Sequence, residues 1–77
     1  MKTNKDKIIE VLKSEVESNL DYKNLDNSAS LTKQGVDSLD FNSVLFKIEE
    51  LYDIEIPDED VQELDSIDKI VNYINGK

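Results

Sequence analysis

The 77-residue sequence contains no cysteine, histidine, arginine or tryptophan. Without cysteine the chain can form no disulfide, no thiolate metal site and no cysteine nucleophile. Without histidine or arginine it also lacks the usual parts of a nucleophile–base triad and of an anion clamp. These absences argue against an enzyme.

Glycine and proline are also scarce, with two glycines and one proline in the whole chain. A sheet protein of this length would need more turn residues than that, so we expect an all-α fold. A chain this short can bury only a modest core, and we therefore expect a single domain over residues 1–77.

Long hydrophobic runs are missing as well. The apolar stretch that begins at Ile8 is interrupted by Glu10 and Lys13, which makes it too short and too charged for a signal peptide or a membrane span. We expect no membrane insertion and a location in the cytoplasm.

Acidic side chains dominate what is present. Eighteen aspartates and glutamates stand against nine lysines, for a net charge of −9. This charge would repel a nucleic acid backbone, so nucleic acid is excluded as a partner. It would attract basic patches on other proteins, and we expect a monomer that docks transiently to such partners.

The first part of the chain is predicted to form one helix followed by one long loop. Apolar residues at helical spacing predict a helix over residues 5–18, with Thr3 or Asn4 as its N-cap. Residues 19–35 are rich in Asn, Asp and Ser and predict a long loop, a length that usually indicates a functional or ordered connection.

The strongest helical pattern starts at Asp37 or Ser38 and ends near Tyr52. Its predicted core stripe consists of Phe41, Val44, Leu45, Ile48, Leu51 and Tyr52. At about 100° per residue, Leu39 and Phe46 project almost opposite this stripe. Isolated exposed apolar residues are ordinary, but an apolar pair rimmed by carboxylates is also how a reversible partner site should look. The expected partner-binding residues are Leu39, Asp40, Asn42, Ser43, Phe46, Glu49 and Glu50.

Two shorter helices complete the predicted fold. Pro57 can open a brief third helix over residues 58–64. Asp65 or Ser66 then caps a fourth helix, and Gly76 stands where a C-terminal cap is expected.

A run of carboxylates precedes and begins the third predicted helix. It fails as an EF-hand, because Pro57 falls inside it and the required glycine and bidentate glutamate are not in place. We expect no specific metal site in this run, which comprises Asp53, Glu55, Asp58, Glu59 and Asp60.

Ser38 is a candidate for covalent modification through a phosphate ester. It lies at the start of the helix whose outer face carries Leu39 and Phe46, where free backbone N–H groups stabilise a phosphate ester. A serine at this place can also be a simple helix cap. Asp37 can cap equally well, however, and would then leave the Ser38 hydroxyl free for modification.

Three segments together suggest a family. The stretch Gly35–Asp40, followed by Ile48–Glu59 and then by Val71–Gly76, resembles the acyl carrier proteins of dissociated fatty acid synthases. The resemblance implies a four-helix bundle with a short third helix and a 4′-phosphopantetheine arm esterified to Ser38. It also implies that partner enzymes contact the helix at Leu39 and Phe46.

The function implied by this resemblance is transport without catalysis. The thiol of the arm would hold acyl intermediates as thioesters and present them to the acyl-transferring and condensing enzymes of fatty acid synthesis. A phosphopantetheinyl transferase would attach the arm from coenzyme A. In that complex we expect Asp37 to support Ser38, by orienting the serine or the metal ion.

Two alternatives remain open at this point. The residues Lys33, Gln34, Ser43 and Lys47 depart from the usual pattern of the family, which favours a discrete carrier for polyketide, aminoacyl or other specialised synthesis. The second alternative is an acidic helical adaptor that uses Leu39 and Phe46 for binding and never carries a prosthetic group.

Overall fold

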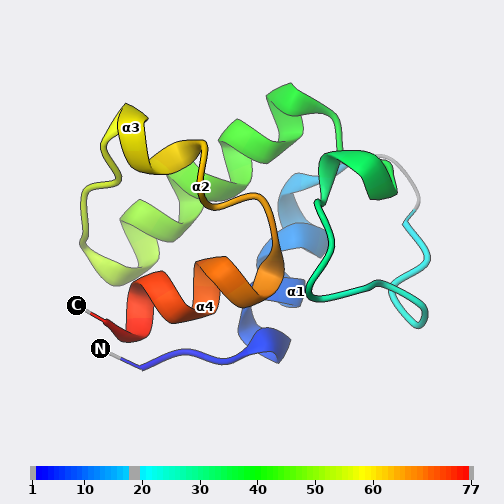
Figure 1. Cartoon of the computed structure of the whole chain (residues 1–77), viewed down its shortest axis with the longest axis horizontal. Helices are drawn as coiled ribbons and strands as arrows, with labels where there is room; N and C mark the ends of the chain where they lie inside the picture. Colours follow the sequence, from blue (N-terminus) through cyan, green and yellow to red (C-terminus); the bar gives the residue numbers. More distant parts are fainter. Residues whose placement is uncertain (1, 18–19, 77) are drawn as a thin grey trace.

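The structure is a computed structural model that describes residues 2–17 and 20–76 (Figure 1). Four α-helices and one short 3₁₀ helix lie among these residues, without any β-strand, which confirms the predicted all-α class. The elements are α1 (Lys5–Glu15), η1 (Thr32–Gln34), α2 (Ser38–Tyr52), α3 (Asp58–Val61) and α4 (Ile67–Asn75).

Helix α1 starts as predicted and ends earlier than predicted. The side chain of Asn4 caps it by accepting a 3.0 Å hydrogen bond from the backbone N–H of Lys7. The helix stops at Glu15, because Val16 turns to extended backbone angles and becomes buried there. The predicted end at Ser18 was therefore too late, and Ser18 itself lies outside the described residues.

The core forms where α1 packs against both α2 and α4. Burial of the apolar side chains of this core supplies most of the stabilisation of so short a chain. The core contains Ile8, Val11, Leu12, Val16, Leu31, Val36, Phe41, Val44, Leu45, Ile48, Ile56, Leu64, Ile67, Ile70 and Ile74.

Two residues of the predicted α2 stripe are not among these buried residues: Tyr52 is half-buried and packs against the core, whereas Leu51 lies outside it. Leu51 is 56% exposed, so its assignment to the core was wrong. It lies on nearly the same side of α2 as the fully buried Val44, but two turns later. There it stands at the edge of a groove between α1 and α2 rather than beneath another helix.

The segment between α1 and α2 is an ordered connection, as its length suggested, and includes a short helix that was not predicted. It contains η1, and Leu31 just before η1 is fully buried. The backbone N–H of Leu31 donates a 2.7 Å hydrogen bond to the carbonyl of Asp65, and the N–H of Asp68 donates one to the carbonyl of Asn27. These two bonds fasten the segment to the start of α4.

Helix α3 is shorter than predicted, ending at Val61 rather than near Leu64. The residues after it form turns in which the N–H groups of Glu63 and Leu64 bond three residues back. Helix α4 then begins with Ser66 as its cap, whose hydroxyl accepts a 3.2 Å hydrogen bond from the N–H of Lys69.

None of the helices described here is long and apolar enough to cross a membrane.

Candidate functional site

The backbone before α2 fixes where that helix begins. Gly35 has φ of 110°, in the left-handed region that favours glycine, and a Cβ atom there would lie 3.3 Å from a side-chain carbon of Leu20. Val36 follows, 2% exposed, with its N–H bonded to the carbonyl of Leu31. A turn and a buried anchor therefore hold the entry to α2 in place, at the end of the molecule farther from the chain termini (Figure 1).

Asp37 and Ser38 have different roles at this helix start. The Asp37 side chain caps α2 by accepting a 2.8 Å hydrogen bond from the N–H of Leu39. Ser38 is exposed and is the first residue of the helix. Within the described part of the chain, no hydrogen bond involves the Ser38 hydroxyl. The structure therefore has Asp37, and not Ser38, as the cap.

The outer side of α2 presents the two predicted apolar residues to solvent. Leu39 is 75% exposed and Phe46 is 63% exposed. Asn42, Ser43 and Glu50 are exposed on the same helix. An apolar pair with polar neighbours is therefore present on this face, as the helical spacing predicted.

Two residues of the predicted partner-binding set are less accessible. Asp40 and Glu49 are each half-buried. One carboxylate oxygen of Glu49 accepts a 3.2 Å hydrogen bond from the backbone N–H of Ile56. Glu49 thus fastens the connection between α2 and α3, a role that the sequence did not indicate because it joins a side chain to a distant backbone group.

Gln34 also has a role that the sequence did not reveal. Its side-chain oxygen accepts a 2.8 Å hydrogen bond from the N–H of Asp26, and its side-chain nitrogen donates to the carbonyl of the same residue at 2.8 Å. The same nitrogen approaches the carbonyls of Ala29 and Ser30. Gln34 therefore organises the loop that precedes α2.

A second small motif closes this loop. The hydroxyl of Ser28 donates a 2.7 Å hydrogen bond to the Asp26 carboxylate, and the Ser28 N–H donates another at 2.9 Å. These bonds, the hydroxyl first, hold the pKa of Asp26 below its ordinary value, because they stabilise the ionised carboxylate.

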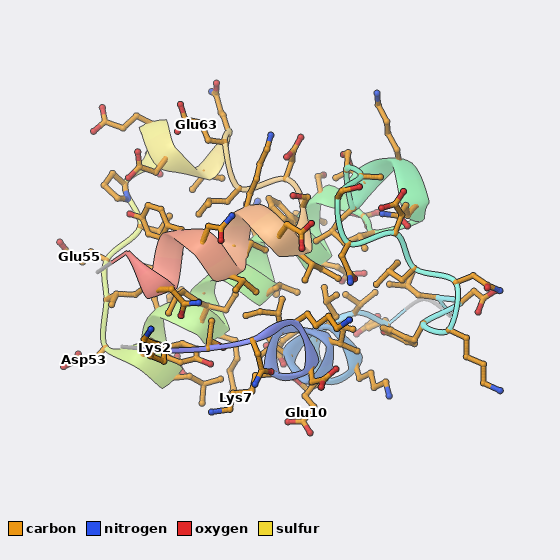
Figure 2. All side chains as sticks on the ribbon, turned by 60° about the horizontal axis from the view of Figure 1, so that its bottom comes forward. Lys2, Lys7, Glu10, Asp53, Glu55 and Glu63 are labelled. Atoms are coloured by element: carbon orange, nitrogen blue, oxygen red, sulfur yellow. The ribbon has the colours of Figure 1, made fainter. Side chains whose placement is uncertain are left out.

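The carboxylates around α3 do not converge on a common point. Figure 2 shows Asp53, Glu55 and Glu63 extending outward from separate places on this side of the molecule. Asp60 instead accepts a 2.9 Å hydrogen bond from the Tyr73 hydroxyl of α4. No cluster of side chains suited to a metal ion occurs in residues 2–17 and 20–76.

Comparisons with known proteins address the chemistry of this site. Residues 6–74 match the family model described as phosphopantetheine attachment site. The chain is 44% identical to an acyl carrier protein of Buchnera aphidicola over 55 residues, covering 71% of this chain and 70% of that protein.

Two further relatives are similar over shorter shares of their length. An acyl carrier protein of Campylobacter fetus is 45% identical over 42 residues, or 54% of each chain. A mitochondrial acyl carrier protein of Neurospora crassa is 46% identical over 55 residues, which span 70% of this chain but only 41% of the fungal protein.

The prosthetic group of this family fits the start of α2. A phosphate ester needs a hydroxyl that solvent and a modifying enzyme can reach, and the exposed Ser38 side chain offers one that is not engaged in capping. The 4′-phosphopantetheine group supplies the thiol that this cysteine-free sequence lacks. The match over nearly the whole chain, the helical fold and this accessible helix start together show that the chain belongs to the acyl carrier protein family, whose members bear phosphopantetheine and carry acyl groups without catalysis.

Proposed function

We propose that the chain carries the acyl intermediates of fatty acid synthesis as thioesters on a 4′-phosphopantetheine arm attached to Ser38. The observation that supports this best is the exposed Ser38 hydroxyl at the first residue of α2, with the cap supplied by Asp37. The arm would leave the protein at the positive end of the helix, where its phosphate is favoured.

We further propose that enzymes dock on the outer side of α2. This docking face comprises Leu39, Asp40, Asn42, Ser43, Phe46, Glu49 and Glu50. Leu39 and Phe46 would supply the apolar contact, and the exposed Glu50 would pair with basic residues of the partner. Asp40 and Glu49 would contribute less, because they are half-buried and Glu49 is already hydrogen-bonded.

The proposed pathway and location follow the character of the relatives. Acyl carrier proteins of Buchnera and Campylobacter are among the similar proteins, and fatty acid synthesis in the cytoplasm is the simplest setting for this chain. The specialised-carrier alternative depended partly on Gln34, whose side chain is occupied by the loop before α2. Gln34 is therefore better explained by loop structure than by partner choice.

The attachment residue can be tested by intact mass. The unmodified protein would be incubated with coenzyme A and a promiscuous phosphopantetheinyl transferase. We expect the mass to rise by one phosphopantetheine, and we expect no rise in Ser38→Ala. Ser14→Ala is the matched control, because it removes an exposed serine of α1, outside the docking face, and should leave modification intact. A modification that persists in Ser38→Ala would assign the arm to another residue.

The pathway can be tested with the modified protein from the same experiment. Acyl-transferring and condensing enzymes of a dissociated fatty acid synthase should load it and extend the acyl group. A modified protein that these enzymes ignore would contradict the assignment to fatty acid synthesis and leave the attachment at Ser38 standing.

A further inference from the structure

A groove of about 380 Å³ lies between α1 and α2. It is distinct from the apolar pair of the docking face, since Leu51 in its lining points about 140° around α2 from Phe46. Val11 and Tyr52 line it together with Leu51, which is 56% exposed. Its size falls in the range of sites for small molecules.

The groove has a fixed apolar wall. Val11 is 6% exposed and belongs to the core. The hydroxyl of Tyr52 is within 2.6 Å of the Thr3 hydroxyl, which holds the ring in place. Leu51 adds a large apolar side chain that no other helix covers. A ligand that covered Leu51 would remove apolar surface from water, which is favourable.

Two lysines give the groove a charge opposite to that of the protein. Lys7 of α1 and Lys47 of α2 both line it, against the single carboxylate of Glu10. Among the described residues the ion pair found is between Lys69 and Asp65, so neither groove lysine forms an ion pair there. Figure 2 shows Lys7 and Glu10 on the outer side of α1, reachable from solvent. In a chain of net charge −9, this is a local excess of positive charge.

We infer that this groove binds a single-chain carboxylate of medium length without a covalent bond. The hydrocarbon tail would cover Val11, Leu51 and Tyr52, and the carboxylate would lie between the ammonium groups of Lys7 and Lys47. At physiological ionic strength charges beyond about 8 Å are largely screened, so the charges that line the groove matter most, and there two lysines stand against the one carboxylate of Glu10.

The proposed ligand belongs to the chemical class of the cargo. When water cleaves an acyl thioester, the acyl carbon gains the hydroxyl and becomes a carboxylic acid, and the sulfur regains its proton as a thiol. The groove would thus bind the free-acid form of an acyl group. It makes no use of Ser38 or of the arm, so this inference is independent of the attachment residue.

The test uses the unmodified protein and decanoate below its micelle concentration. Backbone amide shifts in two-dimensional NMR should move at Val11, Leu51 and Tyr52 and saturate. Decyltrimethylammonium, with the same tail and a positive head, should bind at least about tenfold more weakly. Equal binding of the two amphiphiles, or shifts centred on Leu39 and Phe46, would overturn the proposal.

Paired variants separate local charge from total charge. The double variant Lys7→Gln/Lys47→Gln should lower decanoate affinity about tenfold. Lys23→Gln/Lys33→Gln, which removes two exposed lysines between α1 and α2 and changes the net charge equally, should leave the affinity unchanged. If both double variants weaken binding alike, the groove lysines have no special role and the proposal is wrong.

A second pair tests the apolar contact. Leu51→Gln should weaken decanoate binding, whereas Leu39→Gln, which removes an exposed leucine about 120° away around α2, should not. Far-UV circular dichroism of every variant confirms the fold. Because no arm is present in these titrations, a negative result would leave the Ser38 assignment intact, and failure of modification at Ser38 would leave this inference intact.

Discussion

At the scale of single residues, the start of α2 depends on a division of roles between neighbours. Both Asp37 and Ser38 are residue types that can cap a helix, so the sequence alone left the choice between them open. The structure has Asp37 bonded to the Leu39 N–H. The hydrogen bonds of the native helix can therefore all remain when Ser38 is modified.

This division predicts different stabilities for two neighbouring substitutions. Asp37→Ala should lower the free energy of unfolding by about 1 kcal/mol, because it removes the cap of α2. For a chain of this size that corresponds to a fall in melting temperature of about 4–8 °C. Ser38→Ala should leave the melting temperature nearly unchanged. Thermal unfolding followed by circular dichroism measures both, and an equal loss in the two variants would contradict the assignment of Asp37 as the cap.

Gln34 shows the limit of residue-by-residue prediction. In the sequence Gln34 is notable only as a departure from the family pattern, which favours a specialised set of partner enzymes. Its hydrogen bonds go to backbone groups of Asp26, Ala29 and Ser30, several residues earlier in a loop. Sequence spacing gives no signal for such contacts, because any residue type offers the same backbone carbonyl.

At the scale of elements, the apolar periodicity predicted where the helices lie but not where two of them end. The start and end of α2 were predicted correctly, because its stripe is long and Asp37 marks its beginning. The ends of α1 and α3 were placed about three residues too late. In both places the chain leaves the helix to bury an apolar residue, Val16 after α1 and Leu64 after α3. The spacing of apolar residues along a helix does not show where tertiary packing will end that helix.

Helix α3 depends on a few specific contacts. It has four residues and none of them is buried. Tyr73 of α4 donates a hydrogen bond to Asp60 of α3, and Glu49 of α2 holds the connection before it through the N–H of Ile56. An element with so little buried surface opens more readily than the rest of the fold.

Removal of one of these contacts should therefore act locally. Tyr73→Phe should raise the amide exchange rates of Asp60 and Val61, whose N–H groups bond to Pro57. We expect a global cost of about 1 kcal/mol or less, since a net hydrogen bond contributes about that much. Hydrogen exchange measured by NMR checks this. Tyr22→Phe, in the loop before α2, is the control and should leave both amides unchanged; faster exchange throughout the core in Tyr73→Phe would contradict a local role.

At the scale of the whole molecule, the charge is uneven. The net charge of −9 is spread over the outer side of α2 and the residues around α3, whereas the groove between α1 and α2 has two lysines and one glutamate. The composition alone predicted attraction to basic partners. It could not predict a positive groove, because the two lysines are forty positions apart and meet only after α1 packs on α2.

The overall charge makes docking sensitive to salt. For modification by a phosphopantetheinyl transferase with a basic patch, we expect kcat/KM to fall about threefold or more as ionic strength rises from about 0.01 M to about 0.15 M. Steady-state kinetics over a salt series measures this. Glu50→Gln should lower kcat/KM at low salt and flatten the series. Glu63→Gln, with the same change in net charge after α3, should behave like the native sequence; equal effects would show that only total charge matters.

The two ends of the described chain are held together by hydrogen bonds. The Thr3 N–H donates to the Asn75 side chain at 2.6 Å, and the Asn75 amide donates back to the Thr3 carbonyl at 3.2 Å. In Figure 1 these ends lie on one side of the molecule, and the start of α2 lies toward the other. A molecule immobilised through either end would therefore present Ser38 away from the support. A short linker could also join both ends and cyclise the chain without distorting α2.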